Sequence, residues 1–318
     1  MTSSRVMRIG TRGSALALAQ AGQVATQLSR ITGNEVSLVQ ITTAGDSSAE
    51  PLDIMGGTGV FATALRDALL RRECDLAVHS LKDLPTAAHP GLEIGAVPPR
   101  GDVRDSLCAR GRMSLRQLPA GSRIGTGSPR RAAQLRAIRS DVEVVEVRGN
   151  VDTRLRKVHD GELEAVVLAK AGLERLDRLD ASTEDFDPLT FVPAPGQGAL
   201  AIEHRSADAD EAPAADLIRA LRELDDPHTR AGVTAERALL AALEAGCSAP
   251  VGAWAHVVKN AAGASMLELT AVVICVDGSS AVRKSATGDV ARAQELGREL
   301  AAQLLAEGAA GLMGDRVK

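Results

Sequence analysis

Two matched segments of this sequence place arginine and serine where a predicted strand is followed by a helix. The segment Arg8–Ser14 precedes an alanine-rich helical pattern and recurs loosely as Arg123–Ser128, which is followed by Pro129–Arg131. A helix that begins there directs unpaired backbone N–H groups and the positive end of its dipole at whatever fills the turn. Both segments therefore favour an anion, unless Ser14 and Ser128 serve only as helix N-caps.

Further arginines that could bind an anion follow a second predicted strand. Arg148 and Arg154 follow the strand Val142–Val147, and Arg175 lies farther along the chain. Such a pair could hold neighbouring carboxylates through charge-assisted hydrogen bonds, because a guanidinium donates two parallel bonds. The alternatives are a solvated helix start and, for Arg175, an exposed helix face. Six of the 37 basic residues are lysine, so 31 are arginine, an excess that GC-rich coding also explains.

The predicted apolar strand Leu76–Val78 is followed by a polar cluster. The cluster includes His79, Lys82 and Asp83, and Pro85 ends the segment. In open α/β sheets, ligands lie at the carboxyl ends of strands. Asp83 beside a lysine would keep its charged form, which suits a carboxylate that stabilises a cation or accepts a proton. The alternative is a Lys-Asp surface turn. We interpret His79 as a partly buried structural histidine rather than a base.

Glycine-rich turns and cysteines complete the candidate chemistry. The segment Gly56–Phe61 lacks the Gly-Lys-Ser/Thr ending of a P-loop, so we interpret it as a mobile lid. The four cysteines are widely spaced without a CxxC pair, so neither a zinc site nor another metal site is expected. Cys247 follows Gly246, which we expect to be the left-handed cap of a helix. A helix C-terminus disfavours a thiolate, so the local sequence predicts an inert Cys247.

Composition excludes several classes of partner. The net charge is −4, so no general basic field attracts nucleic acid or an anionic membrane. Three phenylalanines and one tryptophan leave little aromatic surface for stacking on bases. No signal-like segment and no run of about 18 apolar residues occurs, so we expect a cytoplasmic protein.

The order of the predicted elements indicates an α/β fold. A length of 318 residues predicts two or three domains, and short apolar runs alternate with helical patterns as in helix-covered parallel sheets. Proline-rich segments at 98–102 and 193–198 suggest two crossings between domains. We therefore expect domain 1 over 5–99 and 199–222, domain 2 over 103–195 and a small α+β domain 3 over 226–318. The predicted strands are Val36–Ile41, Leu76–Val78, Val142–Val147, Ala165–Leu168, Ala199–Ile202, Val251–Val258 and Leu267–Val276, and the predicted helices are Ala62–Arg72, Ala132–Ile138, one through Val233–Leu243 and Ala291–Leu305.

Taken together, these segments resemble the porphobilinogen deaminase (hydroxymethylbilane synthase) family in order and spacing over nearly the whole chain. The matching segments are Arg8–Gln20, Val78–Thr86, Gly125–Arg136, Val147–Arg154, Pro193–Ala199, Thr234–Leu240 and Gly246–Gly252. The resemblance implies two domains like those of periplasmic binding proteins flanking a cleft, plus a C-terminal domain whose loop cysteine holds a dipyrromethane cofactor through a thioether. It also implies a monomeric transferase of tetrapyrrole (heme) biosynthesis. In the family's reaction, porphobilinogen loses ammonia and the terminal pyrrole of the bound chain attacks its methylene carbon. After four additions, water releases linear hydroxymethylbilane.

The resemblance also assigns roles to individual residues. It makes Cys247 the cofactor attachment point, against the local prediction, and Asp83 the catalytic carboxylate that holds pyrrole N–H groups and stabilises an azafulvenium-like cation. Residues that match cofactor-binding positions are Lys82, Ser128, Arg130, Arg131 and Arg154. Residues that match positions near the substrate or the growing chain are Arg12, Ser14, Gln20, Phe61, Thr126, Arg148, Arg154, Arg175 and Gln197.

This sequence departs from the family pattern at three positions. Thr58 and Ile54 stand where lysine is common, and Gly127 stands where many members have serine. Two other functions remain as alternatives. One is a small-anion-binding protein of two-lobed fold, which gives Cys247 no purpose. The other is a phosphate-ester or nucleotide enzyme, which the missing P-loop lysine disfavours.

Overall fold

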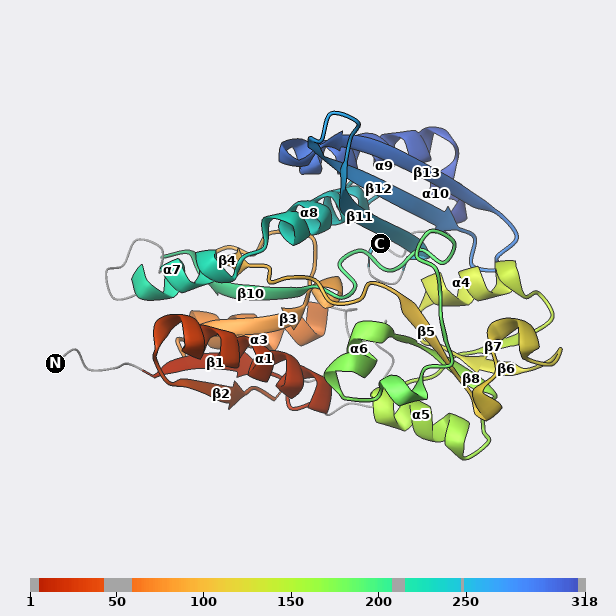
Figure 1. Ribbon diagram of the computed structural model, residues 1–318, viewed down its shortest axis with the longest axis horizontal. Helices are drawn as coiled ribbons and strands as arrows, with labels where there is room; N and C mark the ends of the chain where they lie inside the picture. Colours follow the sequence, from red (N-terminus) through yellow and green to blue (C-terminus); the bar gives the residue numbers. More distant parts are fainter. Residues whose placement is uncertain (1–5, 43–58, 208–214, 247–248, 314–318) are drawn as a thin grey trace. The chain divides into compact units, whose positions relative to one another are not determined.

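The computed structural model describes residues 6–42, 59–207, 215–246 and 249–313, and for residues 59–61 it describes the backbone alone. The chain forms two units (Figure 1), the first made of residues 1–100 and 199–230 and the second of residues 101–198 and 231–318. The domain limits expected from the sequence remain a prediction.

Unit 1 contains a five-stranded mixed sheet in the order β2-β1-β3-β10-β4. Strand β1 (Met7–Thr11) pairs in parallel with β2 (Val36–Gln40) and β3 (Leu76–Ser80). Strand β10 (Leu200–Arg205) is antiparallel to both β3 and β4 (Leu92–Ala96). The parallel sheet expected from the sequence is therefore wrong for these two strands, since β10 enters beside Ser80, at the carboxyl end of β3.

Helices cover both faces of this sheet. Helices α1 (Ala15–Thr32) and α7 (Ala215–Leu224) pack on one face around Ile9, Val24 and Leu221. Helix α3 (Gly59–Leu70) packs on the other face through Leu65, Ala68 and Leu69. Burial of these aliphatic side chains is the main stabilising contribution, because the sequence offers few aromatics.

Unit 2 contains a second five-stranded sheet with the equivalent order, β7-β6-β8-β5-β9. Strand β6 is parallel to its neighbours β7 and β8, as β1 is to β2 and β3. Strand β5, which follows the first crossing segment, is antiparallel to β8. The strands are β5 (Asp105–Ala109), β6 (Arg123–Gly125), β7 (Glu143–Val145), β8 (Ala165–Ala169) and β9 (Glu184–Asp185), and the helices are α4 (Pro129–Ile138), α5 (Val151–His159) and α6 (Lys170–Arg175). Short 3-10 turns occupy Arg110–Arg112, Leu115–Gln117 and Leu179–Ala181.

The repeated Arg-Ile-Gly-Thr segments lie at equivalent places in the two sheets, in β1 and β6. The Arg8 backbone N–H donates to Asp75, directly before β3, and the Arg123 backbone N–H donates to Glu164, directly before β8. Both arginines thus lie at the start of a strand and join it to the next parallel strand. The arginines of the repeated segments therefore have a structural role, and the serines that end these segments cap the following helices.

The C-terminal residues form an antiparallel three-stranded sheet, β11 (Val251–Lys259), β12 (Ser265–Ile274) and β13 (Ala281–Asp289). Helix α8 (Pro227–Ala242) precedes it; a 3-10 turn at Val290–Arg292, α9 (Ala293–Ala306) and α10 (Ala309–Leu312) follow, and α9 lies across the sheet in Figure 1. Trp254 and Ile274 pack with Ala133 and Val192, so this sheet shares a core with the rest of unit 2. The predicted small α+β domain is confirmed.

The predicted elements occur with shifted ends. Most shifts are of one to three residues, and the 142–147 strand shortens to β7. The sequence did not predict β4, β5, β9 or β13. Two of these strands were hard to predict for clear reasons. Strand β5 begins with a buried aspartate, and β13 alternates between exposed and half-buried residues at a sheet edge.

Candidate functional site

Helix α4 begins directly after β6, and its first turn carries three of the predicted site residues. Ser128 is the N-cap, and its Oγ accepts the Arg131 backbone N–H at 3.4 Å. The Ser128 backbone N–H in turn donates to Thr126 Oγ1 at 3.2 Å. Pro129 occupies the first helical position, where a missing N–H costs nothing. Ser128 therefore caps α4, and the cap fixes the turn that carries Arg130 and Arg131; anion binding by Ser128 stays a prediction.

Arg130 and Arg131 share one carboxylate, that of Asp105 at the start of β5. Arg130 Nη2 lies 2.8 Å from Oδ2, and Arg131 Nη2 lies 2.7 Å from Oδ1. Arg131 Nε also donates to Oδ1 at 2.9 Å. The two arginines further donate to backbone carbonyls, Arg130 to Val192 and Arg131 to Val167. All three charged side chains are buried.

The charges in this cluster do not balance. Burial by itself raises the pKa of Asp105, but the charges of Arg130 and Arg131 and hydrogen bonds from Gln197 and Arg131 outweigh it and hold the pKa at about 2. Burial lowers the pKa of Arg130, with the Asp105 charge opposing. Arg130 Nε is a buried donor with no hydrogen-bond partner among the described residues. Two guanidiniums therefore face one carboxylate, and one donor is unused.

Arg154 adds a third guanidinium without adding a carboxylate. It lies in the first turn of α5, whose N-cap Asn150 accepts from the Thr153 backbone N–H at 2.9 Å. Arg154 Nε donates to the Gly149 carbonyl at 2.8 Å, and no carboxylate among the described residues pairs with it. Burial, and then the positive charge of Arg131, lower the pKa of Arg154 to about 10. Both causes oppose the charged form, so an anionic ligand near Arg154 would relieve them.

Arg175 and Arg148 differ in environment. Arg175 ends α6, donates from Nη2 to the Gly198 carbonyl at 2.6 Å, and has its pKa lowered by burial. Arg148 instead lies exposed after β7, and its Nη2 pairs with Glu146 at 2.9 Å. The charge of Glu174 opposes the lowering of the Arg175 pKa, but Arg175, like Arg154, makes no ion pair among the described residues. Arg148 would have to exchange Glu146 for a ligand.

Gln197 is fully buried and bound by protein groups. Its Nε2 donates to the Val103 carbonyl at 2.8 Å and to Asp105 Oδ1 at 2.9 Å, and its Oε1 accepts from Arg131 at 3.4 Å. These hydrogen bonds indicate that Gln197 holds Asp105. The predicted contact of Gln197 with substrate remains a prediction.

In unit 1, Lys82 and Asp83 form a 3-10 turn directly after β3, as the strand-end prediction requires. Both side chains are half-buried. Gln20 Nε2 donates to Ser80 Oγ at 2.9 Å, which ties α1 to the end of β3. Ser14 caps α1 by accepting the Ala17 backbone N–H at 3.3 Å, and half-buried Arg12 lies in the turn before it.

His79 lies in the core of unit 1. Its Nε2 is 3.1 Å from Glu203 Oε2, and Glu203 also binds Arg66 at 2.8 Å. His79 Nε2 nevertheless lacks a hydrogen bond of good geometry. The position agrees with the structural interpretation of this histidine.

Several predicted residues lie outside the described part of the chain. These are Cys247, Thr58, Ile54 and the side chain of Phe61. The end of α8 just before Cys247 is described, and there Glu244 is the left-handed residue, with φ of 50°. Its N–H donates to the Ala241 carbonyl and the Ala245 N–H donates to the Leu240 carbonyl, as in a Schellman motif. The prediction that Gly246 caps this helix is wrong.

The residue that sequence reasoning missed is Asp105. It follows the crossing segment 98–102, which was interpreted only as a link between domains. Its signal is an acidic residue at the head of the short apolar run Ser106–Ala109. A carboxylate beginning a buried strand requires buried cations, and the arginine pair after Ser128 supplies them.

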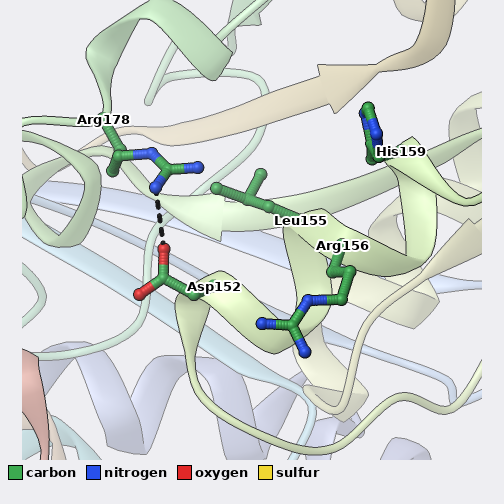
Figure 2. Close-up of a pocket in the computed structure, with 5 residues that line it drawn as sticks. All are labelled: Asp152, Leu155, Arg156, His159 and Arg178. Atoms are coloured by element: carbon green, nitrogen blue, oxygen red, sulfur yellow. Dashed lines mark hydrogen bonds and ion pairs between the residues drawn. The ribbon is translucent and has the colours of Figure 1, made fainter.

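A surface pocket beside α5 is not part of this cluster. Figure 2 shows its lining by Asp152, Leu155, Arg156, His159 and Arg178, with Arg178 Nη1 3.0 Å from Asp152 Oδ1. The four helical residues follow i, i+3, i+4, i+7 spacing, so they share the face of α5 opposite Arg154. The pocket holds none of the predicted site residues.

In the described residues, no group of three or more His, Cys, Asp or Glu side chains could hold a metal ion. Within the same residues, no helix is long and apolar enough to cross a membrane.

Comparison with known proteins identifies the family of both parts of the chain. "Porphobilinogen deaminase, dipyromethane cofactor binding domain" matches residues 7–212, and "Porphobilinogen deaminase, C-terminal domain" matches residues 231–306. The chain is 56% identical to "Porphobilinogen deaminase 1" of Streptomyces coelicolor, over 99% of this chain and 100% of that protein. It is 52% identical to "Porphobilinogen deaminase" of Mycobacteroides abscessus, over 97% of this chain and 100% of that protein. Among solved structures, the methionine-binding protein MetQ aligns with a TM-score of 0.45 and 11% identity, over 69% of this chain and 91% of that chain.

Proposed function

The chain belongs to the porphobilinogen deaminase family, and from that premise we propose that it joins four porphobilinogen units head to tail on a dipyrromethane held by Cys247. Release of the product by water gives hydroxymethylbilane. The observation that carries the proposal is the uncompensated positive charge in unit 2. Arg130 and Arg131 share the single carboxylate of Asp105, and Arg154 pairs with no carboxylate among the described residues.

This cluster fits a ligand that bears several carboxylates. Guanidiniums bind carboxylates by paired, charge-assisted hydrogen bonds, and the N-termini of α4 and α5 add favourable dipoles. When bound, the dipyrromethane supplies the nucleophilic pyrrole carbon that the first substrate unit joins. We propose that Lys82, Ser128, Arg130, Arg131 and Arg154 bind the carboxylates of this cofactor. Contacts with the incoming unit and the growing chain are proposed for Arg12, Ser14, Gln20, Phe61, Thr126, Arg148, Arg154 and Arg175.

Asp83 is the proposed catalytic residue. It lies directly after β3, and its carboxylate has no hydrogen-bond or ion-pair partner in the described part of the chain. A half-buried carboxylate in that position can hold pyrrole N–H groups, stabilise a cation formed by loss of ammonia, and accept a proton.

The remaining cysteines support Cys247 as the attachment point. Cys74 and Cys108 are buried, and burial raises their pKa values to about 11 and about 12. Neither thiol can form a thiolate readily, since burial disfavours the charged form. Cys275 is partly exposed at the end of β12 and is the remaining competitor among the described cysteines.

Intact-mass measurement of the purified protein tests the attachment. Wild-type protein should carry an added mass of two linked pyrroles, Cys247→Ala should lose it, and Cys275→Ala should keep it. Full activity of an unmodified protein, or loss of the adduct only in Cys275→Ala, would rule out the assignment.

A second test concerns the chemical step. Asp83→Asn should retain the adduct yet lose turnover of porphobilinogen, because the amide can neither accept the proton nor stabilise the cation. Asp67→Asn is the control, since Asp67 is an exposed carboxylate in the same unit. Near-normal turnover by Asp83→Asn would remove this residue from the mechanism.

We further propose that the protein acts as a cytoplasmic monomer without a nucleic-acid or membrane partner. The net charge of −4 supports this, because it gives no basic field. Light scattering of the loaded protein tests the oligomeric state.

A further inference from the structure

The Asp105 carboxylate connects three separate segments of unit 2. Its oxygens accept from Arg130 and Arg131 of α4 and from Gln197 of the crossing segment. Gln197 Nε2 also donates to the Val103 carbonyl, just before β5. The carboxylate therefore joins the start of a strand, the start of a helix and a crossing segment at a single point.

This arrangement restricts the rotation of both guanidiniums. Arg131 meets Asp105 Oδ1 through two nitrogens, Nε at 2.9 Å and Nη2 at 2.7 Å, and its Nη1 binds the Val167 carbonyl at 3.0 Å. Arg130 binds Oδ2 through Nη2 and the Val192 carbonyl through Nη1. A planar guanidinium held at two or three nitrogens keeps one orientation, and its remaining N–H groups point in fixed directions.

The unused donor shows that the protein alone does not saturate the cluster. Arg130 Nε is buried and unpartnered among the described residues, although a buried unsatisfied donor is unfavourable. Arg154, whose pKa the nearby Arg131 charge lowers, has one carbonyl partner there. Asp105 thus neutralises one of three positive charges and leaves the rest for a ligand.

We propose that Asp105 is a positioning residue that holds Arg130 and Arg131 in the orientation in which they receive the carboxylates of the cofactor. The proposal rests on the proposed function. Asp105 does not touch the ligand and acts through the two arginines. Its loss should reduce loading of the cofactor.

The test measures adduct occupancy and stability on the same proteins. Asp105→Asn should lower the ratio of loaded to unloaded chains about tenfold or more, since truncating a buried charge pair is costly. Asp105→Glu, which keeps the charge and displaces it by one methylene, should restore part of the loading. In a double-mutant cycle, Asp105→Asn combined with Arg131→Gln should load no worse than the poorer single variant.

A control separates positioning from simple destabilisation. Leu118→Ala removes a buried core side chain of the same unit that carries no charge. It should weaken unit 2, as followed by Trp254 fluorescence in urea, yet load like wild type. Wild-type loading of Asp105→Asn, additive effects in the cycle, or equal loss of loading in Leu118→Ala would overturn the proposal. If Asp105→Asn does not fold, Asp105→Glu decides, and wild-type loading of that variant contradicts positioning. A wild-type protein without adduct would instead refute the proposed attachment.

Discussion

Gly127 lies where the turn before α4 approaches Val147, just after β7. Adding a methyl group at Gly127 tests how closely these two segments pack. A Cβ built at Gly127 lies 2.8 Å from the Val147 carbonyl oxygen, and Arg154 Nη2 lies 3.9 Å away. Real Cβ atoms essentially never approach closer than 3.0 Å, and a backbone oxygen cannot rotate aside as a side chain can. Since the φ of Gly127 is not in the left-handed range, the cost of Gly127→Ala is steric.

The expected loss follows from the shift that the methyl group forces. Ordinary contact begins near 3.4 Å, so the two segments must separate by about 0.6 Å. The Val147 N–H to Thr126 O hydrogen bond is already 3.3 Å long and would break. One lost hydrogen bond at about 1 kcal/mol and overpacking at about 1 to 3 kcal/mol outweigh the unfolded-state gain of replacing glycine, at most about 1 kcal/mol. We expect a net loss of about 2 kcal/mol.

Trp254 provides the assay, because it is the single tryptophan and lies in unit 2 with Gly127. Urea unfolding followed by its fluorescence should show a lower midpoint for Gly127→Ala. The matched control is Gly311→Ala in α10, where no atom lies within 4 Å of an added Cβ and alanine favours the helix. Equal midpoints for Gly127→Ala and wild type would refute the steric argument.

Two further predictions concern uncompensated and compensated buried charge. Arg154→Gln should leave the unloaded protein as stable as wild type or more so, because it removes a half-buried charge without a carboxylate partner among the described residues, while adduct occupancy falls. The control Arg178→Gln breaks a half-exposed pair with Asp152, so it should cost at most about 1 kcal/mol and leave occupancy unchanged; loss of stability in Arg154→Gln alone would contradict this. For Glu203, burial raises the pKa, but the neighbouring His79 and Arg66 side chains outweigh it and hold the pKa at about 2, below its usual 4.5. The stabilisation is therefore present above about pH 4.5 and lost as pH falls toward 2, by about 3 kcal/mol in all. Circular dichroism of acid unfolding should show a smaller loss between these pH values for Glu203→Gln, and an unchanged pH dependence would contradict the coupling.

The sequence predicted local features well where one short segment determines the result. The glycine turns before α1 and α4, their capping serines and the polar end of β3 occur as expected, because each depends on neighbours within a few residues. The direction of strand β10 was not predicted. The antiparallel entry of β10 depends on where the chain returns from the second crossing, and no local pattern encodes that.

The candidate site shows the same limit. Arg130 and Arg131 were recognisable from their position after Ser128, but their pairing with Asp105 joins residues 25 and 26 positions apart. Gln197, more than 90 positions from Asp105 along the chain, completes the cluster. Such pairings arise from the topology of the sheet, which brings the start of β5 beside the start of α4.

The structure divides the arginines in a second way, and their division by ligand remains a prediction. The sequence suggested a division by ligand, with Arg130, Arg131 and Arg154 serving the cofactor and Arg12, Arg148 and Arg175 serving the substrate. Their ion pairs differ: Arg130 and Arg131 pair with an internal carboxylate, whereas burial lowers the pKa of Arg154 and Arg175, which make no ion pair among the described residues. Arginines of the first kind are held in place before any ligand binds. Those of the second kind gain most from a ligand carboxylate, so they should contribute most to its affinity.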